Sequence, residues 1–264
     1  MFITTDSQRP IFIPYGYSSI GKTMIIMRLI RYLRQEGYMV WPNLVFKESS
    51  DQRYHSLCQT YMNQVSCTRA LAATGVKDTL LLDVINHKGK PVCYMLDQAG
   101  KHQYDIDNPH IGFSQEISDI LKLPNPKIWG FIVEDNKWMN HEQRQGYVHN
   151  ISQLAINALS TTDRVIFIYN KVDLTQYVVN YNRINIKGLF DSADSAFPNI
   201  FVPFEELNVV KKIMRGKYKF ELLPFQTGNF TCQADAFGNI YTTFAIGPDE
   251  YPRNLWTNIL KLIK

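Results

Sequence analysis

Residues 15–24 read YGYSSIGKTM, and this stretch decides the fold that we expect. Gly16 and Gly21 stand five positions apart, and Lys22 and Thr23 follow the second glycine directly. The stretch fits the pattern G-x-x-x-x-G-K-[ST], in which a glycine-rich backbone bends so that its N–H groups point inward at a phosphate. The alternative is a tight strand-to-helix turn with an exposed lysine.

The neighbouring segments favour the phosphate loop. PIFIPY at 10–15 predicts a buried strand, and 23–37 predicts an amphipathic helix that stops at Gly37. A helix N-terminus placed after such a loop adds its positive dipole end. Lys22 would reach the β and γ phosphates, and the Thr23 hydroxyl would bind Mg²⁺. The expected phosphate contacts are Gly16, Tyr17, Ser18, Ser19, Ile20, Gly21, Lys22 and Thr23.

Composition sets wider bounds. The chain has 264 residues, 45% of them hydrophobic and 20% charged, which is typical of a globular protein with a sizeable core. The formal net charge of +4 comes without dense Lys/Arg blocks, so nothing indicates nucleic-acid binding. The four cysteines form no CxxC pair, and no apolar run approaches the ~18 residues of a membrane span. We therefore expect a cytoplasmic protein with reduced thiols and no membrane anchor.

Short apolar runs alternate with amphipathic stretches along the rest of the chain, which predicts an α/β fold with a mostly parallel sheet. Residues 79–97 predict an antiparallel hairpin turning at HKGK. Further strands are expected at 128–135, 164–170 and 218–225, and further helices at 151–159 and 252–263. Arg28, Arg31 and Arg34 recur at helical spacing, which predicts a solvated charged face or a docking surface.

We expect one domain over residues 1–264, with insertions. Residues 40–74 and 174–217 are rich in polar residues and do not fit a minimal α/β unit. Residues 230–247 predict a hairpin that turns at Gly238 and Asn239.

A second motif follows the hairpin strand at YMLDQAGK. Asp97 ends an apolar strand, where a carboxylate is costly unless it meets a cation or several donors. A metal ion beside the phosphate loop would satisfy it. Gly100 would let its N–H approach a γ-phosphate with no side chain in the way. Taken alone, Asp-x-x-Gly also fits an ordinary turn.

A third motif follows the strand VIFIYN and contains Asn170, Lys171 and Asp173. The Asp173 carboxylate would accept hydrogen bonds from N1 and the 2-amino group of guanine, which adenine cannot supply. Asn170 and the stem of Lys171 would flank the base and support the phosphate loop. The alternative is a polar turn in which Asp starts a helix.

Together the three motifs resemble those of the P-loop GTPases, the Ras-like superclass that includes the translation factors. The resemblance implies a Rossmann-like three-layer domain that binds GTP or GDP with Mg²⁺. It also implies a loop touching guanine O6, which we place at Thr227 and Gly228, although QTG departs from the usual Ser-Ala-Lys. A switch threonine would bind Mg²⁺, and of Thr68, Thr74 and Thr79 we favour Thr74.

Catalysis is harder to place than binding. Members of this superclass usually carry Gln or His directly after the motif glycine, to orient the attacking water. This chain has Lys101 there, followed by His102 and Gln103. We take His102, Gln103 and Lys22 as the catalytic candidates; the alternative for His102 and Gln103 is a solvated switch segment without a catalytic role. We expect slow hydrolysis unless a partner, or an arginine such as Arg69, completes the site.

The sequence therefore favours a GTP-binding switch with hydrolase activity and a protein effector or activating partner. A GTP-bound scaffold that has lost turnover stays open, because Lys101 replaces the usual glutamine. A nucleotide or small-molecule kinase is less favoured, because it would not need Asn-Lys-x-Asp.

Overall fold

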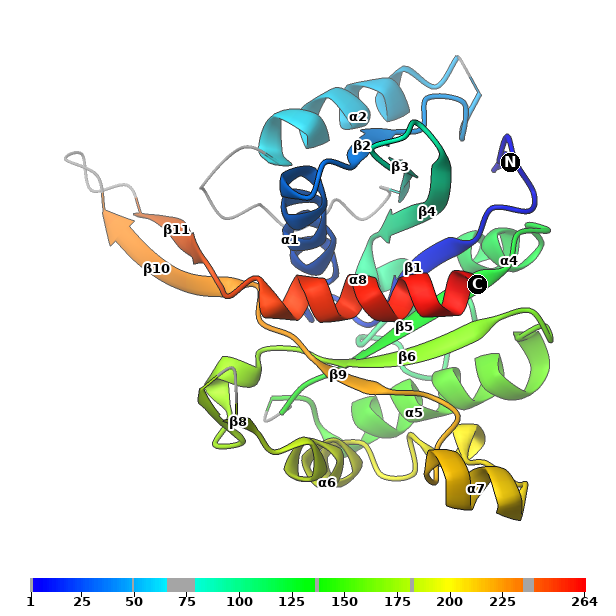
Figure 1. The fold of residues 1–264 in the computed structure, drawn as a ribbon, viewed down its shortest axis with the longest axis vertical. Coiled ribbons are helices and arrows are strands. Elements are labelled where there is room, and N and C mark those ends of the chain that lie inside the picture. The colour runs from blue at the N-terminus through cyan, green and yellow to red at the C-terminus, as the bar shows by residue number, and fades with distance from the viewer. Residues whose placement is uncertain (1, 49, 66–78, 136–137, 181–182, 235–239) are drawn as a thin grey trace.

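The computed structural model describes residues 2–48, 50–65, 79–135, 138–180, 183–234 and 240–264. Its centre is a seven-stranded sheet with the order β2-β3-β4-β1-β5-β6-β9 (Figure 1). The strands are β1 Ile11–Tyr15, β2 Met39–Pro42, β3 Thr79–Ile85, β4 Pro91–Gln98, β5 Lys127–Val133, β6 Arg164–Tyr169 and β9 Leu222–Pro224.

Most of the sheet is parallel. β1 pairs in parallel with β4 on one side and β5 on the other, and β6 and β9 continue the parallel run. β3 and β4 form the expected antiparallel hairpin, and β2 adds an antiparallel edge strand to β3. The prediction of a mostly parallel sheet with one antiparallel hairpin is confirmed.

The parallel strands at the centre are buried on both faces. All residues of β1 and β5 are buried, which is why both segments are apolar runs without a polar alternation. The α-helices of the described residues are α1 Lys22–Gln35, α2 Gln52–Val65, α3 Gly100–Gln103, α4 Gln115–Leu121, α5 His141–Gln153, α6 Ile186–Ala196, α7 Val209–Arg215 and α8 Glu250–Ile263.

The direction of the crossovers sets the layers. The chain moves from β1 through α1 toward the β2 edge, but from β4 through α4, α5 and α6 toward the β9 edge. Parallel crossovers are right-handed, so opposite directions place α1 on one face and α4, α5 and α6 on the other. The last helix, α8, packs beside α1 (Figure 1). The expected three-layer architecture is present.

The regions predicted as insertions contain regular structure. Residues 40–74 hold most of β2 and all of α2, which the polar composition did not predict. Residues 174–217 hold α6, the crossover helix between β6 and β9, together with α7 and the small pair β7 Val178–Asn180 and β8 Arg183–Ile184. The hairpin predicted at 230–247 is β10 Gly228–Ala234 and β11 Ile240–Ile246, and its turn lies outside the described residues.

Two element boundaries differ from those expected. The helix predicted at 151–159 begins earlier, at His141, because Asn140 and Gln143 form a capping box there. It continues as one π-helical turn, Leu154–Ala158. The strand predicted at 218–225 is shortened to Leu222–Pro224, since Tyr218 before it forms an isolated antiparallel bridge with Glu205 instead.

Arg28 does not lie on a solvated face. Its side chain is buried, and its guanidinium donates hydrogen bonds to the Gly247 carbonyl at 2.7 Å and to Asp249 Oδ1 at 2.5 Å. Asp249 precedes α8, so Arg28 ties the end of the β10–β11 hairpin to α1. Helical spacing alone could not show this, because the partner lies at the far end of the chain.

Among the described residues, no helix has both the length and the apolar character that a membrane crossing requires.

Candidate nucleotide-binding site

The carboxyl ends of the parallel strands meet at one edge of the sheet, because parallel strands all point the same way. This edge collects polar residues from distant parts of the chain. Gly16 follows β1, Asp97 lies at the end of β4, Glu134 follows β5, Asn170 follows β6, and Thr227 follows β9 shortly afterwards.

The loop between β1 and α1 has the backbone shape that a phosphate loop needs. Ser19 and Gly21 have φ values of 67° and 102°, in the left-handed region. At Gly21 a Cβ would also lie 2.4 Å from Asn170 Nδ2, so only glycine fits this position. Helix α1 begins directly at Lys22 with no side-chain cap at its N-terminus in the described chain. A helix N-terminus of this kind suits an anion.

Lys22 lies across this loop. Its ammonium donates hydrogen bonds to the carbonyls of Gly16 and Tyr17, both at 2.8 Å, and the side chain is buried. Burial lowers the pKa of Lys22 to about 7, against the opposing effect of the Asp97 carboxylate. A phosphate group placed in the loop would supply the negative charge that the buried ammonium lacks.

Thr23 and Asp97 form a pair of oxygen ligands next to the loop. The Thr23 hydroxyl donates to Asp97 Oδ1 at 3.0 Å, and Asp97 is 2% exposed. The Tyr61 hydroxyl of α2 is buried nearby, and burial together with the Asp97 charge raises the pKa of Tyr61. Hydroxyl and carboxylate oxygens suit Mg²⁺, which takes few protein ligands and completes its shell with water and phosphate. These residues therefore fit a magnesium ion.

The candidates for the switch threonine differ in whether the structure describes them. Thr74, the candidate we favour, and Thr68 lie outside the described residues, as does Arg69. Thr79 is buried at the start of β3, where it pairs with Gln98 of β4 in the sheet register.

Gly100 packs directly on the phosphate loop. A Cβ at this position would lie 2.4 Å from the backbone nitrogen of Ser18 and 2.6 Å from the carbonyl carbon of Tyr17. The backbone of Gly100 therefore touches the backbone of the loop, and no other residue type fits without a shift of one of them. The structure thus brings the second motif against the first.

Gln103 is not a solvated switch residue. It is 2% exposed, and its side-chain amide accepts a hydrogen bond from the Gly16 N–H at 2.8 Å and donates one to the Pro14 carbonyl at 2.9 Å. The Tyr15 hydroxyl donates to the Gln103 carbonyl at 2.7 Å. In this conformation Gln103 fastens α3 to the end of β1, and its amide is engaged there.

The other two side chains after Gly100 face elsewhere. His102 Nδ1 lies 3.1 Å from Glu116 Oε1 of α4, and the His102 carbonyl accepts a hydrogen bond from Ser114. The Lys101 ammonium, which is exposed, donates to Asp107 at 2.8 Å. Of the three catalytic candidates, Lys22 belongs to the phosphate loop, Gln103 contacts the loop at Gly16, and His102 faces α4.

Asn170 contacts the loop between β1 and α1. Its side-chain amide donates to the Ile20 carbonyl at 2.7 Å, and its backbone N–H donates to the Val133 carbonyl. The amide oxygen is buried and has no hydrogen-bond partner among the described atoms. Asn170 therefore connects the first and third motifs across the sheet edge.

Glu134 is a site residue that the sequence analysis missed. This buried carboxylate accepts a hydrogen bond from the Tyr17 hydroxyl at 2.9 Å, and its other oxygen lies 2.6 Å from the Lys171 ammonium. A signal was available, because Glu134 ends an apolar strand as Asp97 does. Lys171 itself has a left-handed backbone, with φ 57°.

The loops expected to contact the base lie side by side. The Phe225 N–H donates to the Tyr169 carbonyl at 2.7 Å, and the Val172 N–H donates to the Phe225 carbonyl at 3.3 Å. Asp173 lies in the single turn of 3₁₀ helix Val172–Leu174 and is exposed, although partial burial raises the pKa of its carboxyl. The turn thus presents Asp173 next to the loop after β9.

Thr227 and Gly228 form the foot of a hairpin. Thr227 is buried, and Gly228 is the first residue of β10. The loop expected to touch the base is therefore continuous with the β10–β11 ladder, which extends from the edge of the molecule (Figure 1).

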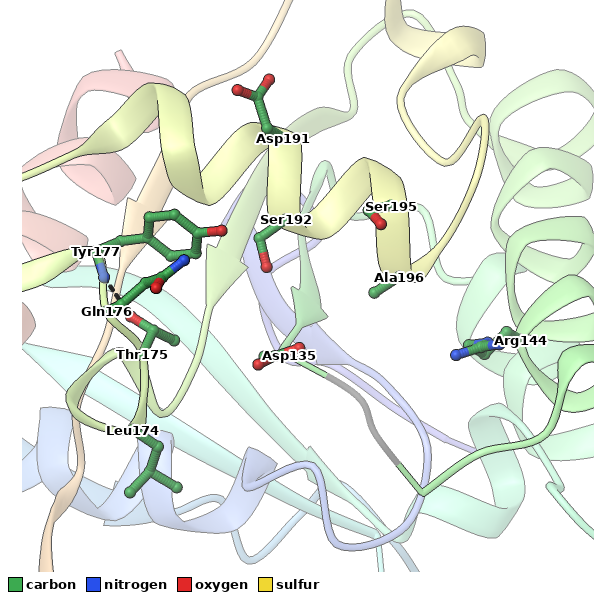
Figure 2. Close-up of a pocket in the computed structure, with 10 residues that line it drawn as sticks. All are labelled: Asp135, Arg144, Leu174, Thr175, Gln176, Tyr177, Asp191, Ser192, Ser195 and Ala196. Carbon is green, nitrogen blue, oxygen red and sulfur yellow. Dashed lines mark hydrogen bonds between the residues drawn. The ribbon is translucent and has the colours of Figure 1, made fainter.

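A separate hollow of about 650 Å³ opens between α5, α6 and the segment 174–177 (Figure 2). Asp135 and Arg144 lie on opposite sides of it, and Ser192 and Ser195 of α6 line its wall. None of the residues predicted to contact a nucleotide lines this hollow, so it is distinct from the phosphate-loop site.

The sequence matches no protein-family model and no curated protein. Solved structures do resemble the fold. The chloroplast translocon components atToc33 and psToc159, for which dimerisation is important for GTPase activity, match with a TM-score of 0.51 and 9% identity over 97% of this chain and 84% of theirs.

Two further structures show lower similarity. Nucleolar GTP-binding protein 1 of Plasmodium falciparum has a TM-score of 0.45 and 10% identity, over 98% of this chain and 89% of its own. The Ski7 GTPase-like domain of S. cerevisiae, bound to GDP and inorganic phosphate, has a TM-score of 0.44 and 12% identity, over 96% of this chain and 50% of its own. Identities this low concern the fold alone.

Proposed function

We propose, from the P-loop GTPase fold of this chain, that it binds GTP and GDP with Mg²⁺ at the edge formed by β1, β4, β6 and β9. One observation carries the proposal. Three sequence motifs that lie far apart in the chain are joined by direct contacts: Gly100 touches Ser18, and the Asn170 amide donates to Ile20. An accidental motif would not be expected to meet the other two.

Each motif has a role in this proposal. Lys22 and the loop N–H groups bind the β and γ phosphates, and Asp173 selects guanine. Thr23 and Asp97 hold Mg²⁺, which when bound offsets the charge of the phosphate oxygens. Asn170 and Lys171 fix the base against the loop, and Thr227 with Gly228 forms its outer wall.

We propose slow hydrolysis without a partner. Gln103 is engaged with β1, His102 with Glu116, and Lys101 has no lone pair to hold water when it is charged. An activating protein would have to rearrange α3 or supply a group of its own. The same contacts favour the second candidate, a GTP-holding scaffold without turnover.

Calorimetry with Mg²⁺ present tests the binding. We expect heat on titration with GTP and GDP, and none at comparable concentration with ATP. Lys22→Ala is the matched variant: it should weaken binding by about tenfold or more, because a charge-assisted contact to phosphate is lost. Absence of binding by wild type, or equal affinity for ATP, would contradict the proposal.

Nucleotide analysis separates the two candidates. Acid extraction of the purified protein should release GDP if the chain turns over GTP, and GTP if it only holds it. Single-turnover hydrolysis as fast as that of a fully assembled site would contradict the slow-hydrolysis proposal.

A further inference from the structure

Helix α7, Val209–Arg215, is an amphipathic helix that exposes its apolar side chains. Four apolar side chains on it are exposed: Val209 by 69%, Val210 by 64%, Ile213 by 80% and Met214 by 78%. Leu207, just before the helix, is 88% exposed. Exposed apolar residues in such a contiguous group usually mark an interaction site.

The apolar and charged residues of α7 separate onto different sides. At about 100° per residue, the apolar positions 209, 213, 210 and 214 fall within an arc of roughly 140°. Lys211, Lys212 and Arg215 occupy the remaining side by position. Because the apolar arc faces solvent instead of the core, this amphipathic pattern does not serve the packing of the domain.

Local capping, not packing, forms the helix. The Asn208 side chain accepts hydrogen bonds from the Val210 and Lys211 N–H groups at 3.0 and 3.2 Å. Gly216 ends the helix with φ 92°, and its N–H donates to the Lys212 carbonyl. The helix is thus preformed before it meets any partner, which reduces the entropy lost on docking.

The segments before and after α7 are hydrogen-bonded to each other and form a stem beneath the helix. The Glu206 N–H donates to the Lys217 carbonyl at 2.8 Å, and the Lys219 N–H donates to the Phe204 carbonyl at 3.0 Å. Aromatic rings fasten both sides of this stem to the domain, with the Phe204 and Phe220 centroids 6.0 Å apart. Figure 1 shows α7 at the margin of the molecule, well separated from α1 and the phosphate loop.

Cationic residues outnumber acidic ones around α7, where Glu205 and Glu206 precede the helix and Glu221 follows it. Between Leu207 and Phe220 the cationic residues are Lys211, Lys212, Arg215, Lys217 and Lys219, and no Asp or Glu occurs. Lys217 pairs with Glu205 at 2.7 Å, whereas no ion pair is found for Lys211, Lys212 or Lys219 within the described residues. The surface therefore combines exposed apolar side chains with an excess of cationic residues, although Glu206 and Glu221 line the same hollow as Lys211 and Lys219.

We propose that α7 docks on an anionic lipid surface. An anionic lipid leaflet has acidic headgroups at its surface and hydrocarbon beneath them. The lysines of α7 would complement the headgroups, and its apolar arc would complement the hydrocarbon. The apolar side chains would enter the boundary of the acyl chains while the lysine stems extend to the headgroups. This is peripheral binding by one short helix, so the contact is weak and reversible, and it does not depend on nucleotide binding.

Co-sedimentation of the full chain with vesicles tests this. Binding to phosphatidylcholine vesicles that contain phosphatidylserine should exceed binding to phosphatidylcholine alone and should fall with added salt. Lys211→Gln should weaken binding about fivefold, the usual effect of one cation at such a surface. Ile213→Asn should reduce it further.

Ile156→Asn is the matched control, because Ile156 is 72% exposed on a different element. All these side chains are exposed, so the variants should keep the wild-type melting temperature. Equal binding to both vesicle types, no binding, or full binding by Ile213→Asn would overturn the proposal. So would sedimentation velocity showing a dimer that Ile213→Asn dissociates without any vesicle binding, since α7 would then contact a second copy.

Discussion

The Lys171 ammonium lies 2.6 Å from Glu134 Oε2, so an ion pair joins the ends of β5 and β6 beside the phosphate loop. The other Glu134 oxygen holds the Tyr17 hydroxyl of the loop. One buried carboxylate therefore connects the residue expected to flank the base with the loop expected to bind the phosphates. This makes Glu134 a positioning residue in the proposed site.

Glu134→Gln should loosen Lys171 while leaving an acceptor for Tyr17. Lys171 is partly exposed, so we expect a stability loss of only about 1 kcal/mol. GDP dissociation, followed with a fluorescent analogue, should become several-fold faster, because the lysine stem is no longer held in place. Tyr17→Phe removes only the other contact and serves as the control. An unchanged dissociation rate in Glu134→Gln would show that the ion pair has no part in binding.

Gly100→Ala should destabilise the protein by about 1–3 kcal/mol, because the new methyl group would overlap the Ser18 nitrogen at 2.4 Å. Thermal unfolding measures this directly. Gly112→Ala is the matched control, since a Cβ at Gly112 meets nothing within 4 Å. If both variants melt at the wild-type temperature, the second motif does not rest on the loop.

Asp173→Asn should weaken GTP binding by about 10- to 100-fold, because a charged acceptor for two donors of guanine is lost. The introduced amide can donate to the 2-oxo group of xanthine, so affinity for XTP should rise. Competition between GTP and XTP for binding measures this change in base preference. Circular dichroism should stay unchanged, since Asp173 is exposed. Equal preference in wild type and variant would contradict the assignment of the base site.

Lys127 predicts a pH dependence of stability far from the site. Its ammonium is buried and donates to the carbonyls of Leu123 and Asn125, and burial lowers its pKa despite the charge of Asp163. The unfolded chain binds the proton more tightly, so this residue costs stability at neutral pH and less as pH rises toward the ordinary value of 10.5. Lys127→Met should therefore stabilise the protein relative to wild type most at neutral pH. Urea unfolding at a series of pH values measures the difference, and a constant difference would contradict it.

The sequence predicted the elements whose signal is local. The strand at 10–15, the helix after it and the hairpin at 79–97 each carry their own periodicity and turn residues, and all three are present. Helix α2 was missed because its polar composition hides a single apolar side, which includes Tyr54, Cys58 and Tyr61. Helix α6 was missed because Asp and Ser interrupt its pattern.

Contacts between distant residues could not be predicted from such signals. Gln103 follows the second motif, where a solvated segment is the usual expectation. Its side chain is instead buried, because it accepts a hydrogen bond from the Gly16 N–H, 87 positions away in the sequence. The helical spacing of Arg28 is typical of a solvated helix face, but its partner Asp249, at the start of α8, lies more than two hundred residues further along the chain. Glu134 was within reach, because the reasoning applied to Asp97 at the end of one buried strand holds equally for the next.

The ribosome synthesises β1, the strand before the phosphate loop, well before β4 and β5, the strands that pair with it. Ile11 lies beside Tyr94 on one side and Lys127 on the other, and the Ile20 carbonyl receives a hydrogen bond from Asn170. Contacts between residues this far apart in the sequence slow folding, because the chain loses the entropy of closing a long loop before the contact can form. During synthesis, residues 11–21 therefore leave the ribosome long before the segments that pack around them, and a nascent chain that ends before Asn170 lacks the hydrogen bond from Asn170 to the loop.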